Sequence, residues 1–312
     1  MKAACSFCLL VLFAATAAAE DWPQWQGPER TNVSRETGLL QSWPAEGPRQ
    51  LWLSKEVGLG YSGIAVVSDT LYTMGMRGED EYLIALNAAD GTEKWSLLMG
   101  PRLSNNWGDG PRGTPTVDGG QVFALSGVGS LVCADAADGS LVWRVEMKDL
   151  GGRVPGWGYT ESVLVDGDRV LCTPGGKGGA VAALNRATGE AVWQSEGYTE
   201  GAQYSSIIPI DHAGKHQFVQ LFMNHLVGFD AADGAVLWKS DFPGKTAVIP
   251  TPIFHAGHVY ITSGYGVGCK LVKLDGLEAV DVYENKLMKH HQGGVVLLAG
   301  KLYGYSDGPG WL

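Results

Sequence analysis

Residues 229–238 read FDAADGAVLW, and this stretch decides the fold. An Asp-Gly pair between two apolar runs is a strong hairpin signal, because glycine adopts a positive φ without a steric penalty. The stretch therefore predicts a strand, a tight turn at Asp233 and Gly234, and a second strand that carries one large aromatic ring, Trp238.

The same phrase occurs at several other places in the chain. Near copies are NAADGTEKW at residues 87–95, DAADGSLVW at 135–143 and NRATGEAVW at 185–193. In each copy a glycine stands four residues before the tryptophan, and an Asn or Asp stands eight residues before it. A weaker copy ends at Tyr283, where tyrosine replaces tryptophan. The chain is therefore an array of one repeated unit.

The spacing of the repeated rings predicts the architecture. Successive rings stand 43, 48, 50, 45 and 45 residues apart, counted over Trp52, Trp95, Trp143, Trp193, Trp238 and Tyr283. Each interval has room for two hairpins, as at residues 63–76 and 81–99. Four short antiparallel strands in about 40–50 residues are typical of a β-propeller blade. A β-sandwich would not repeat one phrase in this way, and no stretch has the 3.6-residue apolar spacing of a helical solenoid.

We therefore expect an all-β propeller of four-stranded antiparallel blades over residues 50–312. Five units are complete, whereas the sixth has one hairpin at residues 295–305 and no copy of the phrase. Propellers close by pairing the two chain ends in one blade, so a strand predicted at residues 50–57 would be the outer strand of the last blade. The incomplete sixth unit predicts a C-terminally incomplete fragment of a seven- or eight-bladed ring. A reading frame that stops at Leu312 in intact genomic DNA would contradict this expectation.

The first 19 residues predict a secretory signal peptide. Lys2 gives a weak positive start, residues 8–13 are apolar, and a run of small residues ends in Ala17-x-Ala19. An uncleaved anchor is the alternative, because about 17 largely apolar residues are marginal for a membrane span. Export to the periplasm or the extracellular space is therefore expected, with no transmembrane span after cleavage. Residues 20–49, rich in Trp, Pro and Gly, are expected to form an irregular N-terminal strap against the main body.

Charge and cysteine content narrow the possible partners. The formal net charge is −10, and the 23 Lys and Arg form no cluster. This balance argues against nucleic acid or an anionic membrane as the main partner. Cys133, Cys172 and Cys269 remain after signal cleavage, and an odd number cannot form a closed disulfide framework. We expect small buried apolar residues, with a reactive thiol or a metal site as the alternative.

The Asp-x-x-[Asp/Thr]-Gly-x-x-x-Trp phrase at this spacing resembles the pyrroloquinoline quinone-type propeller repeat, over about residues 50–312. That repeat occurs in quinoprotein dehydrogenases and in non-catalytic propellers such as the periplasmic outer-membrane assembly factor. The start at residues 22–28, WPQWQGP, resembles secreted bacterial members of the family. The resemblance implies a fold more than an activity, because one fold carries many functions.

The sequence departs from the catalytic members of the family. In the quinoprotein dehydrogenases that the repeat resembles, a disulfide between two adjacent cysteines lies beside the cofactor. Carboxylate and amide oxygens there hold a calcium ion. This sequence has no Cys-Cys pair, and no calcium triad matches residue by residue. The cysteine that anchors the assembly factor to lipid has no counterpart after the apolar run either.

The leading hypothesis is therefore a non-catalytic exported binding or scaffold module for a protein partner or a small polar ligand, with no cofactor or metal. The alternative is a dehydrogenase with an atypical site, which would need pyrroloquinoline quinone and calcium. A carbohydrate-active propeller is a third hypothesis, suggested by Trp107 and Trp157 near the carboxylates of Asp109 and Glu161.

Several motifs that carry chemistry in other proteins are interpreted as structural here. Residues 304–308, GYSDG, match the Gly-x-Ser-x-Gly nucleophile pattern, but no helix follows them. Residues 175–179, GGKGG, lack the ending of a phosphate-binding loop. The pairs His212 and His216, and His255 and His258, have metal-like spacing, but they stand in predicted turns with no helix to align them. The repeated tryptophans are expected to pack neighbouring blades together.

The loops that connect the outer strand of one blade to the inner strand of the next are the informative segments. They are expected to converge on one mouth of the central channel. Aromatic and hydrogen-bonding groups concentrate in NNWGDGPR at residues 105–112, PGWGYTE at 155–161, QYS at 203–205 and HHQ at 290–292. Such mixtures suit recognition of a polar ligand or a peptide, although loops that only pack together and plug the channel are the alternative. The candidate ligand-binding residues are Trp107, Asp109, Arg112, Trp157, Tyr159, Glu161, Tyr204, His290 and His291.

Overall fold

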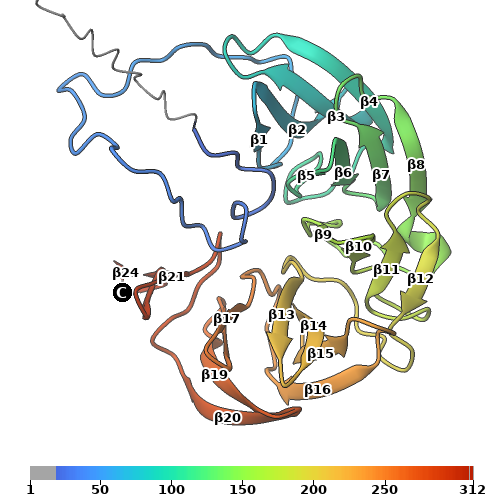
Figure 1. Cartoon of the computed structure of the whole chain (residues 1–312), viewed down its shortest axis with the longest axis vertical. Coiled ribbons are helices and arrows are strands. Elements are labelled where there is room, and N and C mark those ends of the chain that lie inside the picture. Colours follow the sequence, from blue (N-terminus) through green and yellow to red (C-terminus); the bar gives the residue numbers. More distant parts are fainter. Residues whose placement is uncertain (1–18, 309, 312) are drawn as a thin grey trace, which may run out of the picture.

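The computed structural model of the chain describes residues 19–308, 310 and 311. Five four-stranded antiparallel sheets follow one another along the chain, and in each sheet neighbours in sequence are neighbours in space. Figure 1 shows these sheets in an arc around a central axis, with the N-terminal segment on the remaining side. The expected all-β propeller with five complete blades is thus confirmed. The predicted signal peptide lies outside the described residues, apart from Ala19.

The first three blades have similar strands. Blade 1 contains β1 (Ala65–Val67), β2 (Thr70–Arg77), β3 (Asp80–Asn87) and β4 (Glu93–Pro101). Blade 2 contains β5 (Thr116–Asp118), β6 (Gln121–Leu125), β7 (Ser130–Asp135) and β8 (Leu141–Glu146). A short 3-10 helix, η1 (Met147–Leu150), follows blade 2. Blade 3 contains β9 (Leu164–Asp166), β10 (Arg169–Cys172), β11 (Ala182–Asn185) and β12 (Ala191–Gln194).

Two further blades and two short hairpins complete the described chain. Blade 4 contains β13 (Ile208–His212), β14 (Lys215–Leu221), β15 (His225–Asp230) and β16 (Val236–Asp241). Blade 5 contains β17 (Ile253–His255), β18 (His258–Ser263), β19 (Gly268–Asp275) and β20 (Glu278–Asn285). The hairpins pair β21 (Val296–Leu298) with β22 (Lys301–Tyr303), and β23 (Tyr305–Ser306) with β24 (Gly310–Trp311). They form the expected partial sixth blade.

The repeated tryptophan and glycine meet between blades, not within one blade. A Cβ on Gly139 would lie 2.5 Å from the ring of Trp95, which belongs to the preceding blade. The same relation joins Gly189 to Trp143, at 2.8 Å, and Gly234 to Trp193, at 2.4 Å. These three glycines have φ values of 74°, 76° and 76°, in the left-handed region that glycine favours. The ring of one blade therefore lies directly on the turn of the next.

A hydrogen bond fixes each of these rings against the following blade. Trp95 Nε1 donates to the Ala136 carbonyl at 3.1 Å, and Trp143 Nε1 donates to the Arg186 carbonyl at 2.8 Å. Trp193 Nε1 donates in the same way to Ala231, at 3.2 Å. Each blade is thus joined to the next by ring packing and one hydrogen bond. We call this contact the Trp-Gly contact.

The weaker fifth copy of the phrase lacks this contact. Gly276 stands seven residues before Tyr283 instead of four, and nothing lies within 4 Å of a Cβ placed on it. Trp238, in the blade before it, instead donates to Gln217 Oε1 of its own blade at 2.7 Å. The interface between blades 4 and 5 therefore uses other contacts, including β16 against β20.

Trp52 makes the Trp-Gly contact with blade 1. A Cβ on Gly91 would lie 2.5 Å from its ring, and its Nε1 donates to the Ala88 carbonyl at 2.9 Å. The residues around Trp52 therefore lie where the outer strand of a preceding blade would lie. The strand predicted at residues 50–57 is nevertheless wrong, because this segment has no strand conformation and approaches β2 only at its end, where Leu59 forms a single bridge with Met76.

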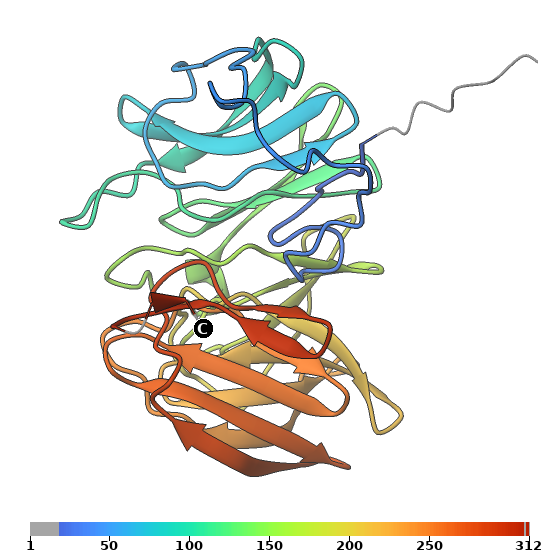
Figure 2. The same cartoon turned by 90° about the vertical axis from the view of Figure 1, so that its left-hand side faces the viewer.

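The N-terminal strap, residues 19–49, reaches the inner edges of all five blades. Trp22 pairs with Val66 of blade 1, and the Pro23 carbonyl accepts the Val117 N–H of blade 2 at 2.8 Å. Trp25 Nε1 donates to Thr251 Oγ1 at 3.3 Å, beside blade 5. Figure 2 shows the strap, in dark blue, toward the rim opposite the long loop that follows β4.

Arg30 anchors the strap to the blades in between. Its side chain is buried, and its guanidinium donates to the carbonyls of Ile207, Ser162 and Val163 at 2.9, 3.1 and 2.5 Å. Its Nε donates to Gln24 Oε1 at 2.9 Å. Burial lowers the pKa of Arg30 to about 10, against the opposing effect of the Glu161 charge. Arg30 therefore joins blades 3 and 4 through three backbone carbonyls.

The Trp-Gly contact predicts a difference between two matched glycine substitutions. Gly189→Ala adds a methyl group against Trp143 at a φ of 76°, whereas Gly276→Ala adds it to open space at a φ of 62°. Both variants lose about 1–2 kcal/mol from the left-handed backbone. Gly189→Ala loses about 1–3 kcal/mol more, because the interface is overpacked. Urea unfolding measures both, and equal losses would contradict the packing role of the ring.

The burial of Arg30 predicts a large loss of stability on its removal. Arg30→Met leaves three carbonyls without their charged donor, and we expect the free energy of unfolding to fall by about 3 kcal/mol or more. Arg35→Met is the matched control, since Arg35 is exposed and pairs only with Glu29 on the strap. Urea unfolding and limited proteolysis within residues 19–49 measure the effect. Similar behaviour of the two variants would show that the strap is not anchored by Arg30.

Candidate channel mouth

A cavity of about 620 Å³ lies where the loops before the inner strands converge. Gly63 precedes β1, Thr114 precedes β5 and Ser162 precedes β9, and all three line the cavity. Ser206, before β13, and His291, before β21, line it as well. We call this cavity the channel mouth. The strap contributes Trp25 to its wall, so the mouth is built from residues far apart in sequence.

Aromatic rings form most of the wall of the channel mouth. They belong to Trp25, Tyr61, Trp107, Tyr204 and Tyr265. Trp107 and Tyr61 are 66% and 61% exposed, which is unusual for rings of this size. The polar part of the wall consists of hydroxyl groups, Gln292, His291 and one cation, Arg112. The side chains that line the mouth include no carboxylate.

Arg112 is held rigidly at the edge of the channel mouth. Its Nε donates to the Trp157 carbonyl at 2.8 Å, and its Nη2 donates to the Gly108 carbonyl at 2.6 Å. Its guanidinium also lies over the ring of Tyr61, 5.0 Å from the ring centre. The loop at residues 105–112 thus folds back onto its own guanidinium, and Gly108 permits this packing because a Cβ there would lie 2.2 Å from the Tyr61 hydroxyl.

His291 is a fixed part of the wall. Its Nδ1 pairs with the Asp307 carboxylate, and its Nε2 accepts the Tyr265 N–H at 2.9 Å. The ring stands edge-on to Tyr265, with the ring centres 4.2 Å apart. Gly264 permits this position, because a Cβ there would lie 2.5 Å from the imidazole. Both ring nitrogens are occupied, so His291 is not placed to act as a general base.

The structure brings four of the nine predicted residues together in the channel mouth, namely Trp107, Arg112, Tyr204 and His291. Trp157 lies behind this wall, with its ring 5.5 Å from that of Tyr204 and its carbonyl bound to Arg112.

The other four predicted residues lie elsewhere and serve the loops themselves. Asp109 accepts hydrogen bonds within its own loop, from Ser104 Oγ and the Asn105 N–H. Tyr159 is buried and donates to the Pro174 carbonyl, while His290 is buried between Tyr305 and Gly294. Glu161 is buried and binds Thr173. Asp109 and Glu161 therefore do not present an acid and a base to the mouth, as glycoside hydrolysis would require.

Several wall residues were missed by the sequence analysis. Tyr61 precedes the first inner strand, between the strand predicted at residues 50–57 and the hairpin predicted from residue 63, in a segment to which no role was assigned. Trp25 belongs to the strap, and Tyr265 belongs to the turn between β18 and β19. Gln292 follows the predicted His291. The position of Tyr61 directly before an inner strand, like that of Arg112, was the signal that could have identified it.

Glu161 is a buried carboxyl group in the segment before β9. It accepts hydrogen bonds from the Thr173 N–H at 2.7 Å and the Thr173 hydroxyl at 2.9 Å. Gln220 Nε2 lies 3.4 Å from its Oε1. Burial raises the pKa of Glu161 to about 7, although the Thr173 hydrogen bonds and the Arg30 charge oppose this shift.

The raised pKa of Glu161 predicts a pH dependence of stability. The folded state binds the proton more tightly than the unfolded chain, so stability falls as pH rises from about 4.5 to about 7. Glu161→Gln removes this contribution, which is on the order of 3 kcal/mol. The difference in unfolding free energy between variant and parent should therefore change across this range. Glu46→Gln, at an exposed position, is the control. If the unfolding free energy of Glu161→Gln changes with pH in the same way as that of the parent, the raised pKa of Glu161 is contradicted.

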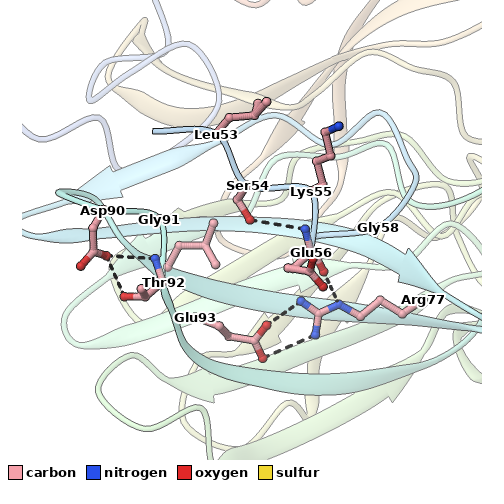
Figure 3. Close-up of a pocket in the computed structure, with 11 residues that line it drawn as sticks. Leu53, Ser54, Lys55, Glu56, Gly58, Arg77, Asp90, Gly91, Thr92 and Glu93 are labelled. Atoms are coloured by element: carbon pink, nitrogen blue, oxygen red, sulfur yellow. Dashed lines mark hydrogen bonds and ion pairs between the residues drawn. The ribbon is translucent and has the colours of Figure 1, made fainter. Parts of the chain in front are cut away.

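Another cavity, of about 920 Å³, lies between residues 53–58 and blade 1. Figure 3 shows Arg77 and Glu93 pointing toward one another across it, and their charged atoms are 2.6 Å apart. Arg77 Nε also donates to the Glu56 carbonyl at 2.8 Å, and Asp90 accepts hydrogen bonds from Thr92. These groups satisfy one another, so we place the candidate site at the channel mouth.

The histidine and cysteine residues have structural surroundings. His216 bridges blades 3 and 4, with Nδ1 2.8 Å from Asp211 and Nε2 3.1 Å from Asp166. Within residues 19–308, 310 and 311, no three His, Cys, Asp or Glu side chains gather as metal ligands. The three cysteines are buried and unpaired, and burial raises the pKa of Cys133 to about 12.

The Gly-x-Ser-x-Gly pattern is structural as well. Ser306 is buried on β23, donates to the Leu287 carbonyl at 2.7 Å and accepts the Lys289 N–H at 2.9 Å. It stands on a strand between two turns, without the strand-to-helix elbow that a nucleophilic serine requires.

Comparison with known proteins defines the family. The family model described as outer membrane protein assembly factor BamB matches residues 79–309, which is most of the chain. This chain belongs to that family. BamB of Yersinia pestis is 24% identical over 255 residues, which cover 77% of this chain and 60% of the relative. The chain thus spans about three-fifths of that relative's length.

Solved structures with the same architecture agree on the fold. The crystal structure of BamB from Moraxella catarrhalis is similar with a TM-score of 0.52 and 18% identity, covering 81% of this chain and 69% of that protein. A europium-containing methanol dehydrogenase is similar with a TM-score of 0.57 and 14% identity, covering 77% and 64%. At these identities the similarity concerns the fold alone. No helix in the described part of the chain is long and apolar enough to span a membrane.

Proposed function

We propose that this chain is an exported, non-catalytic scaffold that binds a protein partner at the channel mouth. The observation that carries the proposal is the pair of exposed rings, Trp107 and Tyr61, beside the rigid guanidinium of Arg112. Trp, Tyr and Arg are the residues enriched at the energetic centres of protein interfaces. Burying such rings on a partner releases water from a large apolar area at little cost in side-chain entropy.

The chemistry of the channel mouth supports binding over catalysis. The side chains that line it include no carboxylate, and both nitrogens of His291 are already bound. The hydroxyl of Ser162 accepts the Thr114 N–H at 2.9 Å, and that of Ser206 accepts the Ser162 N–H at 3.0 Å. These groups stabilise the wall, and none is paired with a base as a nucleophile would be.

Family membership supports the same role and location. The matching family is described as an outer membrane assembly factor, which is a role in assembly of other proteins. The apolar start of the chain followed by Ala17-x-Ala19 supports export to the periplasm. We propose residues 20–49 as a strap and residues 50–312 as the propeller domain that presents the mouth.

Site-specific photo-crosslinking in the bacterium that makes the protein tests this function. A photoreactive amino acid at position 107 should give a discrete adduct with one protein, because Trp107 stands at the rim of the mouth. The same amino acid at position 142, on the exposed outer strand of blade 2, should not give that adduct. Once the partner is identified, Tyr61→Ala should weaken the affinity of this chain for it by about 2 kcal/mol, roughly 30-fold. An adduct from position 142 but not from position 107 would refute the proposed surface.

A further inference from the structure

Arg112 carries a charge that the channel mouth does not neutralise. No Asp or Glu side chain of the described residues forms an ion pair with it, although the whole chain has a formal net charge of −10. The nearby carboxylates are engaged elsewhere: Asp109 with Ser104, Glu161 with Thr173, and Asp307 with His291. Burial raises the pKa of Glu81 and the Arg112 charge opposes this shift, but the Glu81 carboxylate accepts the Leu103 and Gly127 N–H groups. Among the described side chains that line the mouth, Arg112 is therefore the one Lys, Arg, Asp or Glu, and its charge is positive.

Part of the Arg112 guanidinium is available to a ligand. A guanidinium has five N–H donors. Nε donates to Trp157, and Nη2 donates to Gly108 and to Asn105 Oδ1 at 3.3 Å. The two donors on Nη1 have no hydrogen-bond partner among residues 19–308, 310 and 311. The group is thus fixed in position by three of its donors and keeps two for another molecule.

We propose that the channel mouth binds an acidic peptide segment of its partner, with Arg112 as the carboxylate anchor and the surrounding rings holding an adjacent apolar side chain. This inference rests on the proposed function and names the chemistry of the partner. A carboxylate is the acceptor whose charge and shape best suit guanidinium donors. The rigidity of Arg112 reduces the entropy lost when the carboxylate binds.

The dimensions and the wall of the mouth favour a segment over a folded surface. A cavity of about 620 Å³ admits a few side chains. Trp107 and Tyr61 flank Arg112, so an apolar side chain next to the acidic residue would stack on a ring while the carboxylate reaches the guanidinium. The wall hydroxyls and Gln292 leave polar contacts for the peptide backbone.

The test compares two peptides that differ in one functional group. Acetyl-Phe-Glu-Phe-amide and acetyl-Phe-Gln-Phe-amide are titrated into the full chain, with isothermal titration calorimetry as the readout. We expect the Glu peptide to bind roughly tenfold or more tightly than the Gln peptide. Its affinity should fall as salt is raised from 0.05 to 0.5 M, because the pairing is electrostatic. Equal affinities, or no binding of either peptide at millimolar concentration, would overturn the inference.

Protein variants assign the preference to Arg112. Arg112→Gln should bind both peptides equally, and Arg112→Lys should keep only part of the preference, because lysine lacks the planar fork. Arg144→Gln, on the outer strand of blade 2, is the matched control and should keep the full preference. Thermal unfolding shows whether each variant is folded. If Arg112→Gln does not fold, the salt dependence of the parent protein still decides the question.

Two outcomes separate this inference from the function on which it rests. If benzoate binds as tightly as the Glu peptide, the proposal that the carboxylate belongs to a peptide is overturned. If a partner is crosslinked from position 107 but its binding is unaffected by Arg112→Lys and by salt, the scaffold function is retained. Arg112 is then not the carboxylate anchor. If no adduct forms from position 107 but the Glu peptide binds as expected, the scaffold function is refuted and the carboxylate site is retained.

Discussion

The contact on which this propeller depends is an indole ring laid on a glycine of the next blade. The ring needs a turn without a side chain, and the turn needs a residue that accepts a positive φ, so one glycine meets both demands. Because the ring belongs to one blade and the glycine to the next, each copy of the phrase fixes a neighbour as well as itself. The order of blades 1 to 4, and with it the convergence of their loops on one mouth, follows from this contact, whereas blade 5 packs on blade 4 through other contacts.

The repeat made the fold predictable, whereas the directions of the side chains at the mouth could not be predicted. The spacing of identical phrases reports strand number and order directly, and it predicted four-stranded blades. Within residues 155–161 the sequence could not show that Trp157 lies behind the wall while Tyr159 and Glu161 are buried. That difference depends on where the loop meets the next blade. The strand expected around Trp52 failed for a related reason, because propensity cannot supply a pairing partner.

The strap and the blade loops share the work of building the mouth. The loops supply the rim, including Trp107 and Arg112, and the strap supplies Trp25 as part of the wall. A second cavity of about 270 Å³ is lined by Gln26 and Arg30 of the same strap. The strap therefore separates two cavities along the channel. The buried guanidinium of Arg30 and the accessible one of Arg112 show how the same side chain serves structure in one place and recognition in another.

The strap also imposes an order of assembly. Trp25 binds Thr251, which follows it by 226 residues, and Arg30 binds Ile207, which follows it by 177. Contacts of such separation form late, because the chain between them must first become compact. The strap, which precedes all five blades in the sequence, is thus among the last segments to reach its place. The mouth acquires its complete wall only after blade 5 exists, so a partially assembled propeller would not yet present its binding surface.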